Sequence, residues 1–180
     1  MQERGAKALF LDRDGIINVD HGYVYEIDKF EFTEGLFELL RIFVAKGYLL
    51  FVVTNQSGIE RGYYSEDDFQ TLTKWMLDRL KKEGIEVTSV QFCPHEPQKK
   101  CTCRKPKRGM VDKILSQHRI DLANSWLIGD KQSDIDLALN SDIANTIGIG
   151  KRTIEKATHT FKTILECKLF LEENQAIIKS

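Results

Sequence analysis

Short apolar, β-rich runs alternate with segments of helical periodicity along most of the chain. Several of the runs end at a polar residue or a glycine, as buried strands do where they enter a loop. Such alternation predicts an α/β fold of the Rossmann-like, three-layer α/β/α type, with a parallel sheet covered by helices on both faces. The expected strands are residues 7–11, 48–53, 87–92, 125–128 and 143–149, and the expected helices are residues 34–46, 65–83, 109–118, 133–141 and one within 160–178.

The length and net charge of the chain limit the number of domains and the kinds of partner that we expect. Its 180 residues suit a single domain over residues 1–180, and with no extra domain we expect a monomer. Lys and Arg number 26 and Asp and Glu 27, so the near-neutral chain is not expected to bind nucleic acid. It lacks the roughly 18-residue apolar run of a membrane span. It also lacks the apolar stretch of a signal peptide, so we expect a cytoplasmic protein with no membrane partner.

Polar side chains follow three of the expected strands, at the point where each strand ends. Asp12 and Asp14 follow the first strand, Thr54 the second and Asp130 the fourth. Because the carboxyl ends of parallel strands line the binding crevice of an open α/β sheet, we expect these residues to share one site. Oxygen ligands gathered there select a hard cation such as Mg²⁺. The alternative is that Asp12 and Asp14 only cap a turn.

The same residues suit phosphoryl transfer. A cation on Asp12 and Asp130 would offset the repulsion between a carboxylate and an anionic phosphate ester. Asp12 could then attack phosphorus and form an aspartyl phosphate, while Asp14 protonates the departing alkoxide and later activates water. Thr54 and Lys105 would hold the transferred phosphoryl oxygens, and Lys105 would keep Asp12 ionised.

Three of the four cysteines lie close together in the sequence, with a histidine between them. In a cytoplasmic chain such clustering indicates a metal site rather than disulfides. Three thiolates and one imidazole satisfy tetrahedral Zn²⁺ and leave no open position for water, so we expect a structural zinc that shapes the loop at about residues 93–103. The alternative is a reduced, metal-free loop. The expected zinc ligands are Cys93, His95, Cys101 and Cys103.

Four segments of the chain, in order, resemble the four motifs of the haloacid dehalogenase superfamily. The resemblance extends over about residues 7–150. It implies that Asp12 is the nucleophile, Asp14 the acid/base, and Thr54 and Lys105 phosphoryl-binding residues. It also implies that Mg²⁺ is held by Asp12, by Asp130 and by the backbone carbonyl of Asp14. The segments are LDRDG at 11–15, VVTNQ at 52–56, RKP at 104–106 and GDKQSD at 129–134.

Within that superfamily, NVDHGYV at 18–24, FEF at 30–32 and TNQSGIERG at 54–62 resemble the D-glycero-D-manno-heptose 1,7-bisphosphate 7-phosphatases. This resemblance implies a capless fold and removal of the C7 phosphate from a phosphorylated sugar. It also implies a place in the synthesis of ADP-heptose for lipopolysaccharide or another surface glycan. The residues implied to contact substrate are Arg13, Asp20, His21, Gly22, Tyr23, Asn55, Gln56, Ser57, Arg104 and Lys131.

Other functions stay open at this point. Histidinol-phosphate phosphatases share the four motifs and the zinc cluster, and the loop of five residues between His95 and Cys101 is short for some heptose enzymes. A zinc-stabilised binding module is a different class, but it would be expected to have lost Asp12 or Lys105, and both are present. A nucleic-acid end phosphatase is disfavoured because the chain has no basic stripe.

Overall fold

A six-stranded parallel sheet forms the centre of the computed structural model, which describes residues 4–180. The strand order is β3-β2-β1-β4-β5-β6, and each neighbouring pair runs parallel. The chain moves outward from β1 to β3 and then returns to place β4 beside β1, so the strand order reverses at β1 and β4. The strands are β1 (Ala8–Leu11), β2 (Leu49–Asn55), β3 (Val87–Cys93), β4 (Trp126–Gly129), β5 (Asn145–Ile149) and β6 (His159–Phe161).

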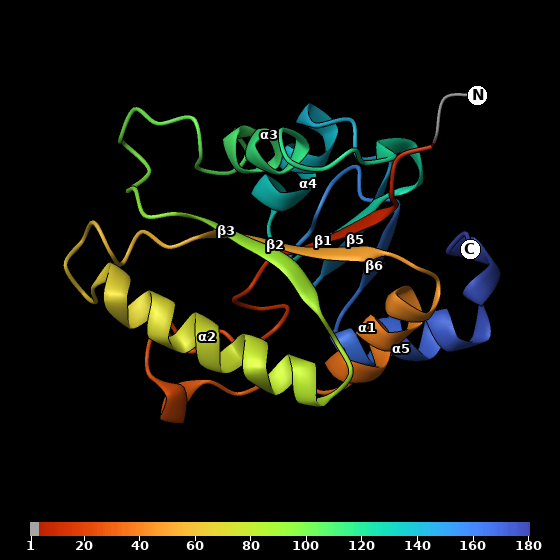
Figure 1. Ribbon diagram of the computed structural model, residues 1–180, viewed down its shortest axis with the longest axis horizontal. Coiled ribbons are helices and arrows are strands. Elements are labelled where there is room, and N and C mark those ends of the chain that lie inside the picture. Colours follow the sequence, from red (N-terminus) through yellow and green to blue (C-terminus); the bar gives the residue numbers. More distant parts are fainter. Residues whose placement is uncertain (1–3) are drawn as a thin grey trace.

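Helices cover both faces of this sheet, as Figure 1 shows. In that view α3 and α4 lie above the sheet, and α1, α2 and α5 lie below it. Side chains of β1 alternate between the two layers: Leu9 and Leu11 pack with α1, α2 and α5, whereas Ala8 and Phe10 pack with α3 and α4. The helices are α1 (Leu36–Ala45), α2 (Glu66–Lys82), α3 (Gly109–Leu115), α4 (Gln132–Asn140) and α5 (Ile164–Glu173). The predicted three-layer α/β/α fold is confirmed.

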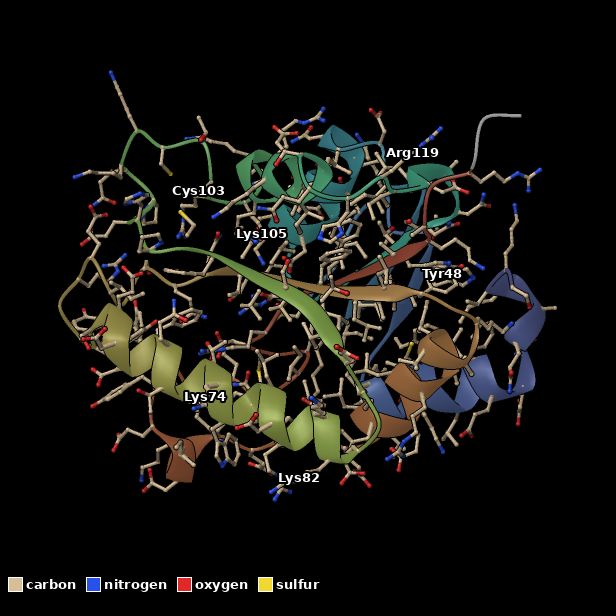
Figure 2. All side chains as sticks on the ribbon, viewed as in Figure 1. Tyr48, Lys74, Lys82, Cys103, Lys105 and Arg119 are labelled. Atoms are coloured by element: carbon tan, nitrogen blue, oxygen red, sulfur yellow. The ribbon has the colours of Figure 1, made fainter. Side chains whose placement is uncertain are left out.

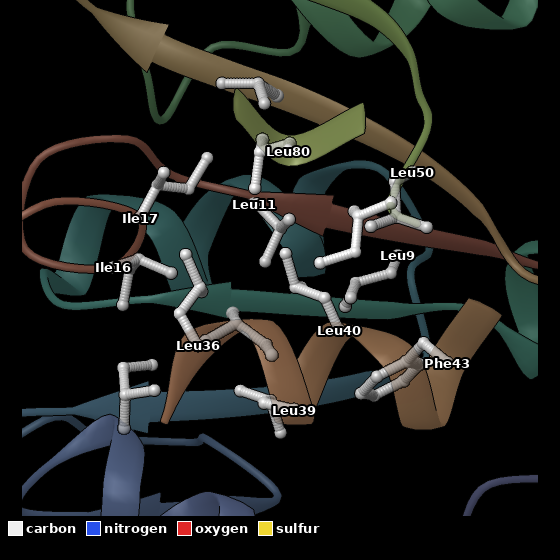
Figure 3. Packing of buried hydrophobic residues seen from close by; sticks show 14 of the residues in the cluster. Leu9, Leu11, Ile16, Ile17, Leu36, Leu39, Leu40, Phe43, Leu50 and Leu80 are labelled. Carbon is white, nitrogen blue, oxygen red and sulfur yellow. The ribbon is translucent and has the colours of Figure 1, made fainter. Parts of the chain in front are cut away.

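The larger of the two cores lies between the sheet and α1. Figure 3 shows Leu36 and Leu40 of α1 facing Leu9 and Leu11 of β1. These four side chains are at most 1% exposed, and burying each one fully stabilises the fold by about 1.5–3 kcal/mol relative to leaving it in water. This packing fixes the end of β1, where the candidate nucleophile follows.

The boundaries of the elements agree with the sequence pattern in most places. Helix α2 begins after Ser65, whose hydroxyl accepts from the Asp68 N–H at 3.0 Å, while the Asp68 carboxylate accepts from the Ser65 N–H at 2.8 Å. Strand β6 was not expected, because its three residues His-Thr-Phe form no apolar run. Short 3₁₀ helices span Ile27–Lys29, Leu122–Asn124 and Gln175–Ile177.

The α-helices of residues 4–180 have between 7 and 17 residues. The longest of them, α2, has 17 residues and carries charged side chains in both its first and its last turn. Across this described part of the chain, we find no helix with both the length and the apolar character needed to cross a membrane.

Candidate active site

A polar pocket of about 310 Å³ opens at the carboxyl ends of the central strands. The loops after β1, β2 and β4 contribute to it, together with the segment that follows β3. This is the position expected for a binding crevice in an open α/β sheet. The pocket is lined by Asp14, Asp20, Tyr23, Asn55, Gln56, Ser57, Tyr64, Arg104, Lys105, Lys131 and Ser133.

Asp12 follows β1 and is only 5% exposed. Its backbone N–H donates to the Ile128 carbonyl of β4 at 3.1 Å, which continues the sheet pairing through this residue. Its carboxylate Oδ1 accepts from the Arg13 N–H at 2.9 Å and from Lys105 Nζ at 2.8 Å. Two donors on one oxygen hold the carboxylate in a fixed orientation.

Lys105 is buried beside Asp12, and Figure 2 shows it on the side of the sheet that α3 and α4 cover. Its ammonium donates to Asp12 Oδ1 at 2.8 Å, to Asp134 Oδ1 at 2.7 Å and to the Val53 carbonyl at 2.9 Å. These bonds match the three donors of an ammonium. Burial alone would lower the pKa of Lys105, but the carboxylates of Asp12 and Asp134 outweigh burial and raise it. Lys105 is therefore a cation at neutral pH.

Carboxylate oxygens of Asp12, Asp130 and Asp134 all lie within 4.8 Å of one another. Asp134 is already satisfied by protein donors, because its Oδ2 accepts from the N–H groups of Asp130 at 3.1 Å and Lys131 at 3.2 Å, while its Oδ1 accepts from Lys105. Asp134 thus anchors Lys105 and the start of α4. The other two carboxylates remain as candidates for a metal ion.

Asp130 has the features of a cation ligand. Its Oδ1 is buried and has no hydrogen-bond partner among residues 4–180. Burial, followed by the charges of Asp12 and Asp134, raises the pKa of Asp130 to about 8. A buried carboxylate in this state is stabilised by a hard cation, so the donor set fits Mg²⁺. Gly15 makes room for it, since a Cβ at Gly15 would lie 2.3 Å from Asp130 Oδ2.

Asp14 lies at the pocket with both carboxylate oxygens held. Its Oδ1 accepts from Arg13 NH2 at 2.9 Å and from Asn18 Nδ2 at 3.0 Å, and its Oδ2 accepts from Gln56 Nε2 at 3.0 Å. Burial works to raise the pKa of Asp14, but the Arg13 charge and these hydrogen bonds outweigh it and hold the pKa below its usual value. Asp14 is therefore an ionised, oriented carboxylate.

Strand β2 and the residue after it deliver the next residues of the site. Thr54 is buried, and its Oγ1 accepts from Gln56 Nε2 at 2.8 Å. The neighbouring Asn55 accepts through Oδ1 from the Lys105 N–H at 3.0 Å, which ties β2 to the segment that carries the lysine. The predicted catalytic residues thus meet in one place through direct contacts and shared partners.

The residues expected to contact substrate divide into two groups. Seven of them line the pocket: Asp20, Tyr23, Asn55, Gln56, Ser57, Arg104 and Lys131.

The remaining three lie elsewhere. His21 and Gly22 line an adjoining hollow, and the His21 ring contacts Glu31 Oε2 at 3.0 Å. Arg13 is 2% exposed, and its guanidinium donates to Asp14 and to the Val24 carbonyl at 2.6 Å. The Arg13 side chain therefore orients Asp14 and does not line the pocket, because its polar atoms are directed into the protein.

Tyr64 and Ser133 line the pocket and had no predicted role, whereas Asp134, the last residue of GDKQSD, was expected in the carboxylate cluster without a role of its own. Asp134 lies at the third position of α4, four residues after Asp130, where an acidic residue is a helix-start signal that places it beside Asp130. Ser133 lies within GDKQSD, so its motif could have identified it, whereas Tyr64 carries no comparable signal.

Three sulfur atoms of the predicted zinc cluster lie together at the end of β3 and in the loop that follows it. Cys93 Sγ is 3.8 Å from Cys101 Sγ and 2.6 Å from Cys103 Sγ, a donor set that fits a soft or borderline metal ion. His95 is not part of this group, because its Nδ1 lies beside Glu60 Oε1 at 3.8 Å. Its carbonyl accepts from Arg104 NH1 at 3.1 Å, which links the cysteine loop to the pocket.

Comparisons with known proteins agree with this geometry. A family model described as HAD-hyrolase-like matches residues 102–159. A D-glycero-alpha-D-manno-heptose-1,7-bisphosphate 7-phosphatase of Campylobacter jejuni is 47% identical over 168 residues, covering 93% of this chain and 96% of its own. A D-glycero-beta-D-manno-heptose-1,7-bisphosphate 7-phosphatase of Helicobacter pylori is 44% identical, covering 92% and 94%.

Solved structures show the same fold. The D,D-heptose 1,7-bisphosphate phosphatase of B. bronchiseptica, complexed with magnesium and phosphate, has a TM-score of 0.80 at 24% identity, covering 93% of this chain and 99% of its own. The corresponding enzyme of Burkholderia thailandensis has a TM-score of 0.65 at 22% identity, covering 92% and 98%. At these identities the likeness supports the fold.

Proposed function

Because the chain belongs to the D-glycero-D-manno-heptose-1,7-bisphosphate 7-phosphatase family of the haloacid dehalogenase superfamily, and is a phosphatase, we propose that it removes the C7 phosphate of heptose 1,7-bisphosphate. One observation carries the proposal: buried Asp12 is paired with Lys105 at 2.8 Å at the polar pocket, near an Asp130 carboxylate that lacks a hydrogen-bond partner on Oδ1 among residues 4–180. A nucleophile, a fixed positive charge and a free metal ligand are thereby combined.

Asp12 is the proposed nucleophile. Its Oδ1 accepts both hydrogen bonds described above, so we place the attack on phosphorus at Oδ2. The attack forms an aspartyl phosphate and breaks the bond between phosphorus and the C7 oxygen of the sugar. The Lys105 ammonium lies 2.8 Å from Asp12 Oδ1, so it orients the carboxylate and offsets its negative charge as the anionic phosphate approaches.

Asp14 is the proposed acid/base. Ionised in the free enzyme, Asp14 takes up a proton as the anionic substrate binds beside it and gives that proton to the C7 alkoxide as the oxygen leaves. Again a carboxylate, it then takes a proton from the water that hydrolyses the aspartyl phosphate. Its place in the pocket wall, fixed by Arg13, Asn18 and Gln56, suits this role. Thr54 and Lys105 then hold the phosphoryl oxygens as their charge changes, and Lys105 does so by exchanging one of its three hydrogen bonds within the protein.

Phosphatases of this superfamily use Mg²⁺, and we place the ion on the carboxylates of Asp12 and Asp130 and on the backbone carbonyl of Asp14. When bound, Mg²⁺ neutralises the charge of the phosphate group and of the acidic cluster. The chain's own contribution is the orientation of the ligands: Gly15 admits the Asp130 carboxylate, and Lys105 fixes Asp12.

We further propose that Cys93, His95, Cys101 and Cys103 bind a structural Zn²⁺. The grouping of the three sulfurs supports this, and the His95 ring would have to join them on binding. The loop runs directly into Arg104, which lines the pocket, so a metal that fixes the loop would also fix Arg104. On this proposal residues 1–180 are one catalytic domain with a metal loop at about 93–103, although residues 1–3 lie outside the described structure.

The substrate contacts follow from the pocket walls. Arg104 and Lys131 supply positive charge for a bisphosphorylated sugar, while Asp20, Asn55 and Ser57 supply groups that can hydrogen-bond to sugar hydroxyls. The relatives named above include enzymes for both anomers of the 1-phosphate, so the anomer is left open. Histidinol phosphate is not favoured, since these relatives are heptose bisphosphate phosphatases. We place the enzyme, as a cytoplasmic monomer, in ADP-heptose synthesis.

The proposal is tested by comparing kcat/KM for heptose 1,7-bisphosphate, as each anomer, with kcat/KM for histidinol phosphate. We expect a clear preference for one heptose anomer, and phosphorus NMR of the product should show that the 1-phosphate is retained. A preference for histidinol phosphate, or release of the 1-phosphate first, would contradict the substrate assignment.

A further inference from the structure

A hydrogen-bond relay leads from Tyr64 to the proposed acid/base. The Tyr64 hydroxyl lies 2.5 Å from Gln56 Oε1, and Gln56 Nε2 lies 3.0 Å from Asp14 Oδ2 and 2.8 Å from Thr54 Oγ1. Tyr64 and Gln56 are buried, with 6% and 3% exposure. The Gln56 amide is therefore held at three points.

The donors and acceptors allow one arrangement of this relay. The Gln56 Nε2 atom faces Asp14 Oδ2, so the NH₂ group of the amide lies on the Asp14 side and donates to the carboxylate. The carbonyl oxygen of Gln56 then faces Tyr64, and the tyrosine hydroxyl must donate to it. Burial raises the pKa of Tyr64 to about 12, so the hydroxyl keeps its proton at neutral pH.

The loop before α2 delivers Tyr64 to this position. A Cβ at Gly58 would lie 2.2 Å from a ring carbon of Tyr64, so the ring reaches Gln56 only because Gly58 lacks a side chain. The Tyr63 N–H donates to the Gly58 carbonyl at 2.9 Å, and Ser65 caps α2 immediately afterwards. Hydrogen bonds on both sides of Tyr64 therefore fix the loop that carries its hydroxyl.

We propose that Tyr64 is a positioning residue: by holding the Gln56 amide, it keeps the Asp14 carboxylate in the orientation needed to protonate the leaving oxygen. The inference rests on the proposed function, since it takes Asp14 as the acid of the first step. Tyr64 lines the same pocket, and the relay is its link to the reacting groups.

The consequence depends on the leaving group of the substrate. A sugar or other alkyl alkoxide is strongly basic and needs a proton from Asp14 as it departs, whereas p-nitrophenolate departs without one. The value of kcat/KM reports the steps up to the first irreversible one, which is phosphoryl transfer to Asp12 on this mechanism. Misplacing Asp14 should therefore lower kcat/KM for an alkyl phosphate far more than for p-nitrophenyl phosphate.

The test compares Tyr64→Phe with wild type on heptose 1,7-bisphosphate and on p-nitrophenyl phosphate. We expect a fall of about tenfold in kcat/KM on the heptose ester, the size of one hydrogen bond, and less than about threefold on the aryl ester. Tyr25→Phe is the matched control, because the Tyr25 ring stacks on the Tyr64 ring with centroids 5.3 Å apart. Removing the Tyr25 hydroxyl should leave the hydrogen bond between Tyr64 and Gln56 in place. It should behave as wild type on both esters.

A double-mutant cycle tests the route through Gln56. Gln56→Leu should lower kcat/KM on the heptose ester at least as far as Tyr64→Phe does, and adding Tyr64→Phe to it should cause little further change, because Tyr64 acts only through the amide. Equal losses on both esters, additive effects, or no loss in a folded Tyr64→Phe enzyme would overturn the inference. If wild type prefers another alkyl phosphate, the same comparison is made with that ester. A different preferred sugar would then contradict the proposed substrate without contradicting the role of Tyr64.

Discussion

The Lys105 ammonium contacts the Asp12 carboxylate at 2.8 Å, and both groups are almost completely buried. The same ammonium contacts Asp134 at 2.7 Å, so one cation is shared by a carboxylate at the end of β1 and a carboxylate in the first turn of α4. This arrangement places a fixed positive charge beside the proposed nucleophile. It also makes the lysine responsible for the stability of two buried negative charges.

Replacing Lys105 by methionine should therefore harm both catalysis and stability. We expect kcat to fall by at least about 100-fold, because a fixed charge on the phosphoryl oxygens is lost. Unfolding in urea should show a loss of about 3–5 kcal/mol, since two buried carboxylates lose their partner. The exposed Lys113→Met is the control and should change neither quantity. A stable Lys105→Met enzyme with nearly full activity would contradict the assigned role.

Gly15→Ala should have two effects: backbone strain, and displacement of the Asp130 carboxylate at the metal site. Gly15 has φ +91°, and its added Cβ would lie 2.3 Å from Asp130 Oδ2. Gly47→Ala is a matched control, since Gly47 has φ +78° with nothing within 4 Å, and its strain alone should cost about 1–2 kcal/mol. We expect Gly15→Ala, but not Gly47→Ala, to raise the Mg²⁺ concentration needed for half-maximal activity. Equal behaviour of the two variants would show that the contact is unimportant.

Removal of metal from the cysteine loop should be visible without an activity assay. We expect about one zinc per purified chain, and a chelator that removes it should lower Tm and make three thiols reactive. Cys167 should stay unreactive until the protein unfolds, because it is fully buried. The variant Cys101→Ser should lose the zinc, whereas Cys167→Ser should keep it. Protein that is free of zinc but has the same Tm would refute a structural metal.

The buried thiol of Cys167 should make stability depend on alkaline pH. Burial raises the pKa of Cys167 to about 12, above its unfolded value of about 8.5. The folded state therefore retains a proton that the unfolded state loses, so this contribution is complete below about pH 8.5 and decreases as pH rises toward 12. Wild type should lose stability relative to Cys167→Ala between pH 8.5 and 10, by at most about 1.4 kcal/mol per pH unit. A constant difference in urea unfolding across this range would argue against the shift.

The sequence was sufficient for the elements that are defined by local pattern. The apolar run before Asp12 forms the central strand β1, because its Leu and Phe side chains pack on both faces of the sheet. The helix predicted to start near Ser65 does so, and Ser65 is its N-cap. The edge strand β6 escaped prediction, because its pairing with β5 depends on the backbone and not on an apolar run.

At the site too, features set by the local sequence could be predicted and features set by tertiary contacts could not. Residues adjacent to strand ends, such as Thr54 and Asp130, could be placed from the sequence because parallel strands bring those ends together. The inward turn of Arg13 and the relay from Tyr64 could not, since they depend on which partners tertiary packing brings within hydrogen-bonding distance. The position of the His95 ring beside Glu60 also depends on a tertiary contact that the sequence does not indicate.

The central claim is that Asp12 carries the phosphoryl group during turnover. Borohydride added during steady-state hydrolysis reduces an aspartyl phosphate to homoserine, and mass spectrometry of the peptide containing residues 8–15 identifies the modified position. We predict homoserine at position 12 in wild type with substrate, and none in its absence or in Asp12→Asn. Turnover with no reduced residue, or reduction at another aspartate, would contradict the mechanism.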